Sequence, residues 1–350
     1  MPVAAVVLNP TSVDVARLRR AVQHAQQTAG WEPSLWFPTT RDDPGQRAAH
    51  DALDACPDVV LVVGGDGTVR TIAEEVRQAA PLTIVPTGTG NLLARNLRLP
   101  LTDLDQAVSV AFTGRDHAID IISATLERAS GAVTECIFLT MAGVGLDAAM
   151  ALHSNTSLKS LFGWVAYIPP IARSVLANQS FAVEYRVDNN DRQSTSAHTM
   201  IIGNCGVLTG DIVLMPAAAV DDGLLDVVIL QPGRRLSGWT PIGIRLAANG
   251  AVHRRRHRLR KTPRGLPSSR SAFHAQASGF EAIFEEPQLI ELDGDIIDHI
   301  TRARFKLLAG QLTLRMPRDI RMPRDIRMPR DIRMPRDIRM PRDIRMPRDN

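Results

Sequence analysis

The chain has 350 residues and a formal net charge of +4, with 41 lysines and arginines against 37 aspartates and glutamates. Apolar residues make up 44% of it, which excludes wholesale disorder, and the length allows two domains with a sizeable core. Residues 316–350 hold 11 Arg and 6 Asp, so residues 1–315 carry about −1, and the charge gives no reason to expect a nucleic-acid partner.

The first 115 residues alternate between apolar runs of strand length and amphipathic segments with helical spacing. Continuous apolar runs such as residues 59–63 are typical of strands buried in a parallel sheet. We predict strands at 3–8, 35–37, 59–63 and 82–85, and helices at 13–29, 46–55, 69–76 and 102–112. This order predicts an α/β domain over residues 1–115, with a parallel sheet and helices on both faces.

After Arg115 the segments are mostly strand-like and are joined by Gly, Asp or Asn turns. We predict strands at 117–126, 133–141, 181–187, 197–203, 224–230, 288–292, 302–308 and 311–314. They predict an antiparallel, β-sandwich-like second domain over residues 116–315. We expect its end, near residues 300–315, to pack back on the first domain.

Three further segments of the second half do not fit the strand pattern. Residues 161–177 and 236–249 have helical spacing, and the polar, basic residues 252–278 predict a loop or insertion. From residue 316 the chain repeats Met-Pro-Arg-Asp-Ile-Arg. A proline every six residues disfavours both helix and sheet, so 316–350 is expected to be a disordered, low-complexity tail.

The cysteines and the apolar runs indicate the cellular compartment. Cys56, Cys136 and Cys205 lie far apart without metal-ligand spacing, which suits a reducing compartment. The N-terminal apolar run is short and lacks basic residues, so we interpret it as a strand and not as a signal peptide. No apolar run reaches 18 residues. We therefore expect a soluble, cytoplasmic protein.

The motif with the most specific chemistry is Gly64-Gly65-Asp66-Gly67-Thr68, directly after the predicted strand 59–63 and before a helix. Glycines let backbone amides approach a ligand closely, and a helix N-terminus favours an anion such as phosphate. An aspartate in such a loop makes sense if Mg²⁺ or a transferable proton lies between it and the phosphate. The alternative is a tight turn with a surface aspartate.

Two more loops follow predicted strands of the same sheet. Pro86-Thr87-Gly88-Thr89-Gly90-Asn91 offers hydroxyls and flexible glycines, and Asn9-Pro10-Thr11-Ser12 ends the first strand. Together with the first loop they predict the walls of one nucleotide cleft. Taken singly, the former could be a plain turn and the latter a helix N-cap.

These three motifs together resemble the diacylglycerol kinase catalytic family, which includes soluble bacterial lipid kinases and the sphingosine and ceramide kinases. The resemblance extends over nearly all of residues 1–315. Its second half is carried by Gly203-Asn204, by Pro216 with Asp221-Asp222-Gly223-Leu224, and by Glu291-Leu292-Asp293-Gly294-Asp295. It implies a two-domain kinase that binds ATP and a lipid in the cleft between its domains.

The resemblance also implies roles for single residues. ATP would be contacted by Asn9, Pro10, Thr11, Ser12, Thr40, Gly64, Gly65, Asp66, Gly67, Thr68, Val69, Arg70 and Thr89, with Thr39 as the alternative to Thr40. Asp66 would act near the transferred phosphate and its Mg²⁺. Asp293 and Asp295 would lie near the acceptor hydroxyl, one of them as general base, unless they form a solvated turn.

A second, structural Mg²⁺ is implied at Asp222, helped by the backbone carbonyls of Ala219 and Leu224. An Asp-Gly β-hairpin turn is the alternative there. The chain departs from the family where Asp295 replaces the usual Glu, Leu92 a common Asp and Val13 a common Gly.

An apolar acceptor would bring the protein to a membrane surface. The aromatic-rich residues 158–171 could rim a lipid entrance, and the basic residues 254–261 could bind acidic headgroups. A core helix and a solvated loop are the respective alternatives. We expect peripheral membrane contact, and a homo-oligomer is compatible with the sequence.

Three functions remain open at this stage. The first is an ATP-dependent lipid kinase that phosphorylates a hydroxyl of diacylglycerol or a similar lipid. The second is an NAD kinase-like enzyme, which would share the Gly-Gly-Asp-Gly-Thr loop, although no Asn-Glu pair follows the second loop here. The third is a nucleotide-binding regulatory protein without catalysis, which Leu92 and Asp295 keep open.

Overall fold

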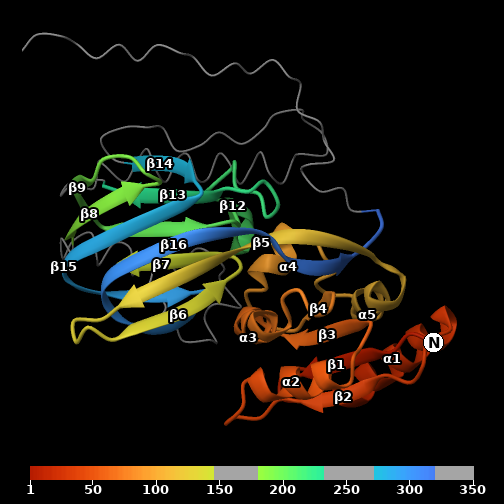
Figure 1. Cartoon of the computed structure of the whole chain (residues 1–350). Helices are drawn as coiled ribbons and strands as arrows, with labels where there is room; N and C mark the ends of the chain where they lie inside the picture. Colours follow the sequence, from red (N-terminus) through yellow and green to blue (C-terminus); the bar gives the residue numbers. More distant parts are fainter. Residues whose placement is uncertain (146–179, 232–271, 320–350) are drawn as a thin grey trace, which may run out of the picture.

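The computed structural model describes residues 1–145, 180–231 and 272–319. Its N-terminal part holds four parallel strands in the order β2-β1-β3-β4 (Figure 1). Their bounds are β1 Ala4–Leu8, β2 Leu35–Pro38, β3 Val59–Gly64 and β4 Leu82–Pro86. β1, β3 and β4 are buried along their whole length, as their continuous apolar sequences predict.

Five helices accompany this sheet: α1 Val15–Ala29, α2 Gln46–Asp54, α3 Asp66–Val76, α4 Leu92–Asn96 and α5 Leu104–Thr113. Successive side chains of a strand point to opposite faces. Ala4 and Val6 of β1 therefore pack in one core with α1 and α5, whereas Ala5 and Val7 pack in another with α2, α3 and α4. The predicted parallel sheet with helices on both faces is confirmed.

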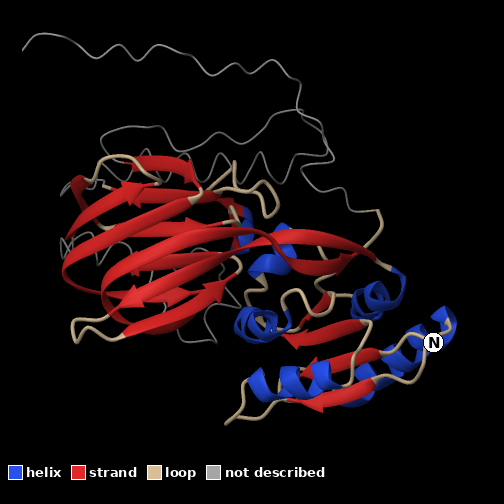
Figure 2. Ribbon diagram, viewed as in Figure 1, coloured by secondary structure: helices blue, strands red, loops and turns tan. Residues whose placement is uncertain are grey.

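The second half of the described chain is almost entirely β-sheet (Figure 2). Its strands are β5 Arg115–Glu127, β6 Val133–Phe138, β7 Met141–Gly145, β8 Phe181–Val187, β9 Gln193–Ala197, β10 Thr199–Gly203, β11 Val207–Leu208, β12 Ile212–Val213, β13 Leu225–Leu230, β14 Ala272–Ala277, β15 Gly279–Leu292 and β16 Asp295–Met316, with a 3₁₀ turn at Thr209–Asp211. Their pairing with one another is antiparallel.

The antiparallel strands enclose a large hydrophobic core. Phe138 and Phe305 meet edge to face with ring centroids 5.9 Å apart, and side chains from β5 and from the distant β13 join the same cluster. Because strands far apart in the sheet order share this core, the sheet folds over itself. The predicted sandwich-like second domain is confirmed.

β16 joins the two halves into one sheet, and its colour in Figure 1 shows it crossing between them. It pairs with β15 and β5 along most of its length, and near its end Leu314 pairs in parallel with Leu82 of β4. The end of the described chain therefore lies against the first domain, and the hairpin between β15 and β16 is anchored to both.

Several boundaries differ from the sequence-based expectation. The helix predicted at 69–76 begins at Asp66, and the strand predicted at 288–292 begins at Gly279. Residues 133–141 form two strands, because the backbone at Leu139 and Thr140 turns to donate hydrogen bonds to Asp293. The predicted strands 302–308 and 311–314 are one strand, β16, with a register shift between Leu308 and Leu312. At the shift, Gly310 donates its N–H to the Asp120 side chain. Met316, assigned to the tail, is the last residue of β16.

Another difference lies in the segment 252–278, for which the sequence predicts a loop. Its described end forms β14, because the polar side chains of His274 and Gln276 are paired with the buried Asp226 of β13. The predicted helices 161–177 and 236–249, the residues 158–171 and 254–261 and the tail from residue 320 lie outside the described residues. Within the described ranges, none of the helices is both long and apolar enough to cross a membrane.

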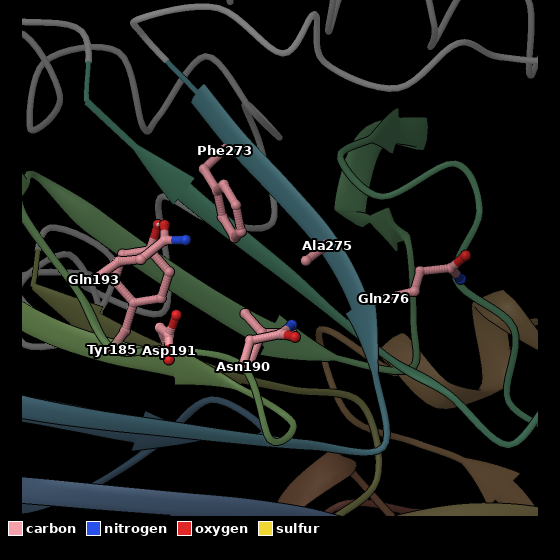
Figure 3. A pocket seen from close by; sticks show the side chains of 8 residues that line it. Tyr185, Asn190, Asp191, Gln193, Phe273, Ala275 and Gln276 are labelled. Atoms are coloured by element: carbon pink, nitrogen blue, oxygen red, sulfur yellow. The ribbon is translucent and has the colours of Figure 1, made fainter. Parts of the chain in front are cut away.

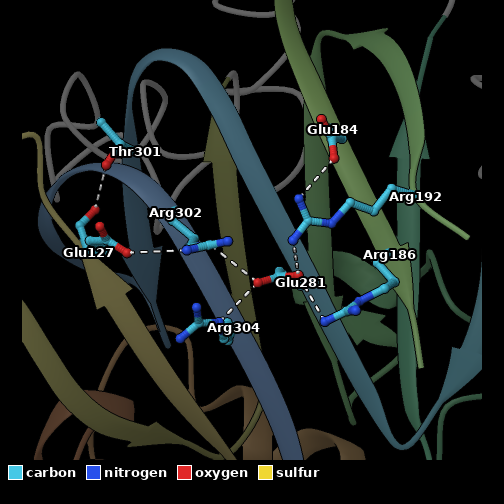
Figure 4. Close-up of polar contacts among 8 residues, drawn as sticks. All are labelled: Glu127, Glu184, Arg186, Arg192, Glu281, Thr301, Arg302 and Arg304. Atoms are coloured by element: carbon cyan, nitrogen blue, oxygen red, sulfur yellow. Dashed lines mark hydrogen bonds and ion pairs between the residues drawn. The ribbon is translucent and has the colours of Figure 1, made fainter. Parts of the chain in front are cut away.

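A charge network on the outer face of the second domain ties β8, β15 and β16 together (Figure 4). Its centre is the carboxylate of Glu281, whose side chain is only 8% exposed. Arg304, Arg186, Arg192 and Arg302 place nitrogens 2.9, 3.1, 3.2 and 3.2 Å from it. Burial alone would raise the pKa of Glu281, but the hydrogen bond from Arg304 and the other arginine charges outweigh it and lower the pKa.

Replacing Glu281 with glutamine is therefore expected to lower the free energy of unfolding at pH 7 by about 1.5–3 kcal/mol, the range for hydrogen bonds to charged groups. A lowered pKa means that the stabilisation is present above the ordinary value of 4.5 and is lost as the pH falls through the folded-state value. Urea unfolding at pH 7 and in acid measures both effects. Glu184→Gln is the control, since Glu184 pairs only at the surface. Equal losses in both variants would contradict the central role of Glu281.

Candidate active site

Three loops meet at the edge where the parallel strands end. The N–H of Asn9, after β1, donates to the carbonyl of Val63 in β3 over 3.0 Å. The Ser12 hydroxyl lies 2.9 Å from the Thr87 hydroxyl, and the N–H of Thr87 donates to the carbonyl of Gly64 over 3.0 Å. The sheet order reverses between β1 and β3, which is where open α/β sheets bind ligands.

The loops after β3 and β4 touch through their backbones. A Cβ atom placed on Gly88 would lie 2.5 Å from the Cα of Gly65, so no larger residue fits there without moving the loops apart. Asn91 fixes the second loop by accepting from the N–H of Gly88 at 3.0 Å and donating to its carbonyl at 2.7 Å. The two glycine loops thus form one continuous backbone surface, with the exposed Thr89 beside it.

The loops after β1 and β2 complete this edge. The Asn9 side chain accepts hydrogen bonds from the N–H and hydroxyl of Thr11, at 3.1 and 2.7 Å, while Pro10 and Thr11 are exposed. After β2, Thr39 is buried and Thr40 is exposed. Of the two threonines, Thr40 is therefore the one that a ligand can reach.

Asp66 is the first residue of α3, and its carboxylate faces the start of α4. It accepts the N–H of Leu93 over 3.4 Å, and a Cβ atom on Gly90 would lie 2.8 Å from its Oδ2. Burial raises the pKa of Asp66 to about 6, with help from the charge of Asp293, while the backbone N–H groups of residues 91–93 oppose the rise. Asp66 thus combines a helix-capping contact with a readily protonated carboxylate.

Asp293 and Gly294 form the two-residue turn between β15 and β16. Their φ angles of 50° and 90° are those of a turn that favours Asp-Gly. The buried Asp293 carboxylate accepts from the N–H groups of Leu139, Thr140 and Met141 at 2.9, 2.8 and 3.1 Å, and from the Thr140 hydroxyl at 2.5 Å. Burial raises its pKa, and the hydrogen bonds from Thr140 and Leu139 oppose the rise. This carboxylate holds the hairpin to the β6–β7 connection.

Asp295, two residues further on, is placed differently. Its side chain is 52% exposed, and its Oδ2 lies 2.7 Å from Nη2 of Arg70 in α3. A Cβ atom on Gly67 would lie 2.6 Å from the same oxygen, so the first turn of α3 lies directly against this carboxylate. The structure therefore brings together Asp66, Gly67, Arg70, Asp293 and Asp295 from the two halves of the chain.

Asp222 lies in the loop before β13, in a separate group of acidic residues. Its Oδ1 accepts the N–H of Leu224 over 3.1 Å. Burial raises its pKa to about 6; the bond from Leu224 opposes this, and the charges of Asp226, Asp120 and Asp221 add to it. The flanking strands do not pair with each other, since β12 pairs with β11 and β13 with β10 and β14. The hairpin alternative is therefore wrong.

Asp222 offers one carboxylate to a cation. In the described parts of the chain no three His, Cys, Asp or Glu side chains form a metal-binding group. A cation at Asp222 would therefore depend on backbone carbonyls such as those of Ala219 and Leu224. Burial, with the charges of Asp226, Asp120 and Asp221, raises the pKa of Asp222, and a cation beside it would favour its ionised form. A carboxylate and backbone carbonyls are oxygen donors, the kind of ligand that Mg²⁺ prefers.

Two cavities lie outside this constellation. One of about 330 Å³ opens between the β8–β9 hairpin and β14, where Tyr185 and Phe273 face each other with ring centroids 5.3 Å apart (Figure 3). Another of about 270 Å³ lies beside the loops after β1 and β4 and is lined in part by Ser12, Thr87 and Asp103. Neither is lined by Asp66, Asp293 or Asp295.

Sequence reasoning missed two parts of the site. Thr140 holds Asp293 although it stands 153 positions away in the sequence, and no local pattern marks it. The ion pair of Arg70 with Asp295 joins residues 225 positions apart. Asn91 adopts a left-handed φ of 49°, a conformation in which Asn is enriched, so its residue type is a local signal for this turn.

Two protein-family models match this chain. The model of the diacylglycerol kinase catalytic domain matches residues 3–124, and that of the YegS C-terminal NAD kinase beta sandwich-like domain matches residues 140–242. A "probable lipid kinase YegS-like" of Pseudomonas aeruginosa strain UCBPP-PA14 is 29% identical over 303 residues, which cover 85% of this chain and 89% of that protein.

Another relative and a solved structure are also similar to this chain. A protein of the same description from Pseudomonas fluorescens strain Pf-5 is 31% identical over 228 residues, which cover 63% of this chain and 70% of that one. The crystal structure of a diacylglycerol kinase from Bacillus anthracis superposes with a TM-score of 0.62 at 18% identity, over 91% of this chain and 98% of that one. The superposition supports the fold alone.

Proposed function

The chain belongs to the diacylglycerol kinase catalytic family, and on that premise we propose that it transfers the γ-phosphoryl group of ATP to a hydroxyl of diacylglycerol or a related lipid. The observation that carries this proposal is the contact between the two glycine loops beside Asp66. Backbone amides at a helix N-terminus suit a polyphosphate. The acidic hairpin that faces them comes from the other domain, which would present the acceptor.

In the proposed reaction the acceptor oxygen attacks the γ-phosphorus, the bond from phosphorus to the bridging oxygen of ADP breaks, and the hydroxyl proton passes to a carboxylate. Such transfer depends mainly on positioning and charge neutralisation. The exposed Asp295 is the better general base, because the Asp293 carboxylate already accepts four hydrogen bonds.

The proposal includes Mg²⁺. Asp66 would hold one ion at the phosphates, and Asp222 with the carbonyls of Ala219 and Leu224 would hold a second, structural ion. When bound, Mg²⁺ supplies positive charge to the phosphate oxygens. The protein's own contribution is to fix the loops, through the Gly65–Gly88 contact, and to keep Asp66 beside them.

A lipid acceptor requires contact with a bilayer surface. A single exposed apolar side chain such as Ile296, directly after Asp295 and 37% exposed, is ordinary on a protein surface. Membrane contact rests instead on the apolar acceptor that the proposed reaction requires. We therefore keep peripheral membrane contact as part of the proposed function.

The proposal is tested with γ-labelled ATP and Mg²⁺ against mixed micelles of diacylglycerol, sphingosine or ceramide, with NAD as a water-soluble acceptor. We expect label in a lipid product that is extracted into organic solvent and none in NAD. Label in NAD alone would replace the lipid kinase with the NAD kinase-like alternative. Nucleotide binding without transfer to any acceptor would favour a regulatory protein.

A further inference from the structure

Arg70 makes an ion pair that phosphate binding would not require. It stands four residues after Asp66 on α3, so both side chains lie on one face of the helix. Its side chain is only 14% exposed, and its Nη2 lies 2.7 Å from Oδ2 of Asp295. The pair joins the first domain to the hairpin of the second across 225 sequence positions.

The surroundings of Arg70 keep its guanidinium in this place. Burial raises the pKa of Glu74 on the same helix, of Cys136 in β6 and of Asp293 in the hairpin, and the nearby charge of Arg70 opposes each rise. Gly67 leaves the Asp295 carboxylate room to lie against α3. Asp295 is thus held on one side by a helix backbone and on the other by a largely buried arginine.

We propose that Arg70 is a positioning residue, which acts by holding the Asp295 carboxylate at the first turn of α3, beside the glycine loops after β3 and β4. This inference rests on the proposed function. Asp295 is half exposed and stands at the tip of a hairpin, where a free side chain would sample several rotamers. A fixed partner with a charge-assisted hydrogen bond restricts it to one of them. Arg70 thereby couples the acceptor side of the cleft to the nucleotide side.

The test compares Arg70→Met and Arg70→Lys with Arg128→Met. The control removes another arginine–aspartate pair, in which Arg128, directly after β5, lies 2.5 Å from Asp298 of β16. Steady-state kinetics of lipid phosphorylation are measured over a range of ATP concentrations. We expect Arg70→Met to lower kcat by about 10²-fold, the cost of a misplaced reacting group, with the KM for ATP unchanged. Arg70→Lys should recover part of kcat, and Arg128→Met should match the wild type.

A double-mutant cycle adds the decisive comparison. If Arg70 acts through Asp295, adding Arg70→Met to Asp295→Asn should lower kcat no further than Asp295→Asn alone. A double variant whose loss is the product of the single losses would overturn the proposal. So would a raised KM for ATP with an unchanged kcat, since this would make Arg70 a phosphate contact.

The outcomes separate this inference from the proposed function. A wild-type protein that transfers phosphate to none of the lipids rejects the function, whereas an active wild type with additive variants rejects only the role of Arg70. Circular dichroism spectra and thermal midpoints check that each variant folds. If Arg70→Met does not fold, Arg70→Lys combined with Asp295→Asn gives the same test of additivity.

Discussion

Asp66→Asn is expected to lower lipid phosphorylation at least about 10³-fold while the protein remains folded. The asparagine oxygen can still accept the N–H of Leu93, so the contact with α4 is kept. What the substitution removes is the negative charge beside the glycine loops. Turnover with labelled ATP and the urea-unfolding midpoint together measure the two effects.

Asp66→Ala serves as the comparison for this variant. Alanine removes the charge and also the acceptor for Leu93, so its midpoint should fall below that of Asp66→Asn while its activity is equally low. If Asp66→Asn turned over lipid at the wild-type rate, the charge of Asp66 would have no part in the reaction.

The raised pKa of Asp66 gives this prediction a pH dependence. Its value of about 6 means that the carboxylate is ionised at pH 7 and becomes protonated in mild acid. If the ionised form is the active one, kcat/KM of the free enzyme should fall about tenfold for each pH unit below that value. A flat profile between pH 5 and 7 would show that the ionised form is not required.

The second large effect is expected at the hairpin. Asp295→Asn should lower kcat about 10²–10⁴-fold, the usual contribution of a general base, with little change in stability because the side chain is half exposed. An amide at this position can still accept a hydrogen bond from Arg70, but it cannot take up the proton of the acceptor hydroxyl.

Asp293→Asn should give the opposite pattern. The buried carboxylate accepts four hydrogen bonds, and an amide would turn a donor toward at least one of those N–H or O–H groups. The free energy of unfolding should fall by about 1–3 kcal/mol. If Asp293→Asn instead remained fully stable and lost all activity, while Asp295→Asn remained active, the two roles would have to be exchanged.

Much of the first domain could be predicted because its signals are local. The apolar run of β3 marks a buried parallel strand, and the glycines that follow it mark the loop before α3. The same reasoning placed the loops after β1 and β4 at one sheet edge, where the Ser12–Thr87 contact now joins them. Short apolar strands and glycine turns contain this information within a few residues.

The rest depended on pairings between distant residues. β14 was missed because its His274 and Gln276 look solvent-exposed in sequence, although both bind the buried Asp226 of the neighbouring strand. The Asp-Gly turn after β15 could be recognised as a motif, but the different contacts of Asp293 and Asp295 could not be predicted. Thr140 engages one and Arg70 the other, and neither partner is near the turn in sequence.

In the proposed reaction the glycine loops after β3 and β4 bind the phosphates of ATP. Hydrogen exchange of the backbone amides, measured with and without a non-hydrolysable ATP analogue and Mg²⁺, tests it most directly. We predict slower exchange for residues 64–69 and 87–91 when the nucleotide is present, and no such change in β8, β9 or β14. Unchanged exchange in both loops at saturating nucleotide would contradict the claim, and with it the assignment of a kinase reaction to this cleft.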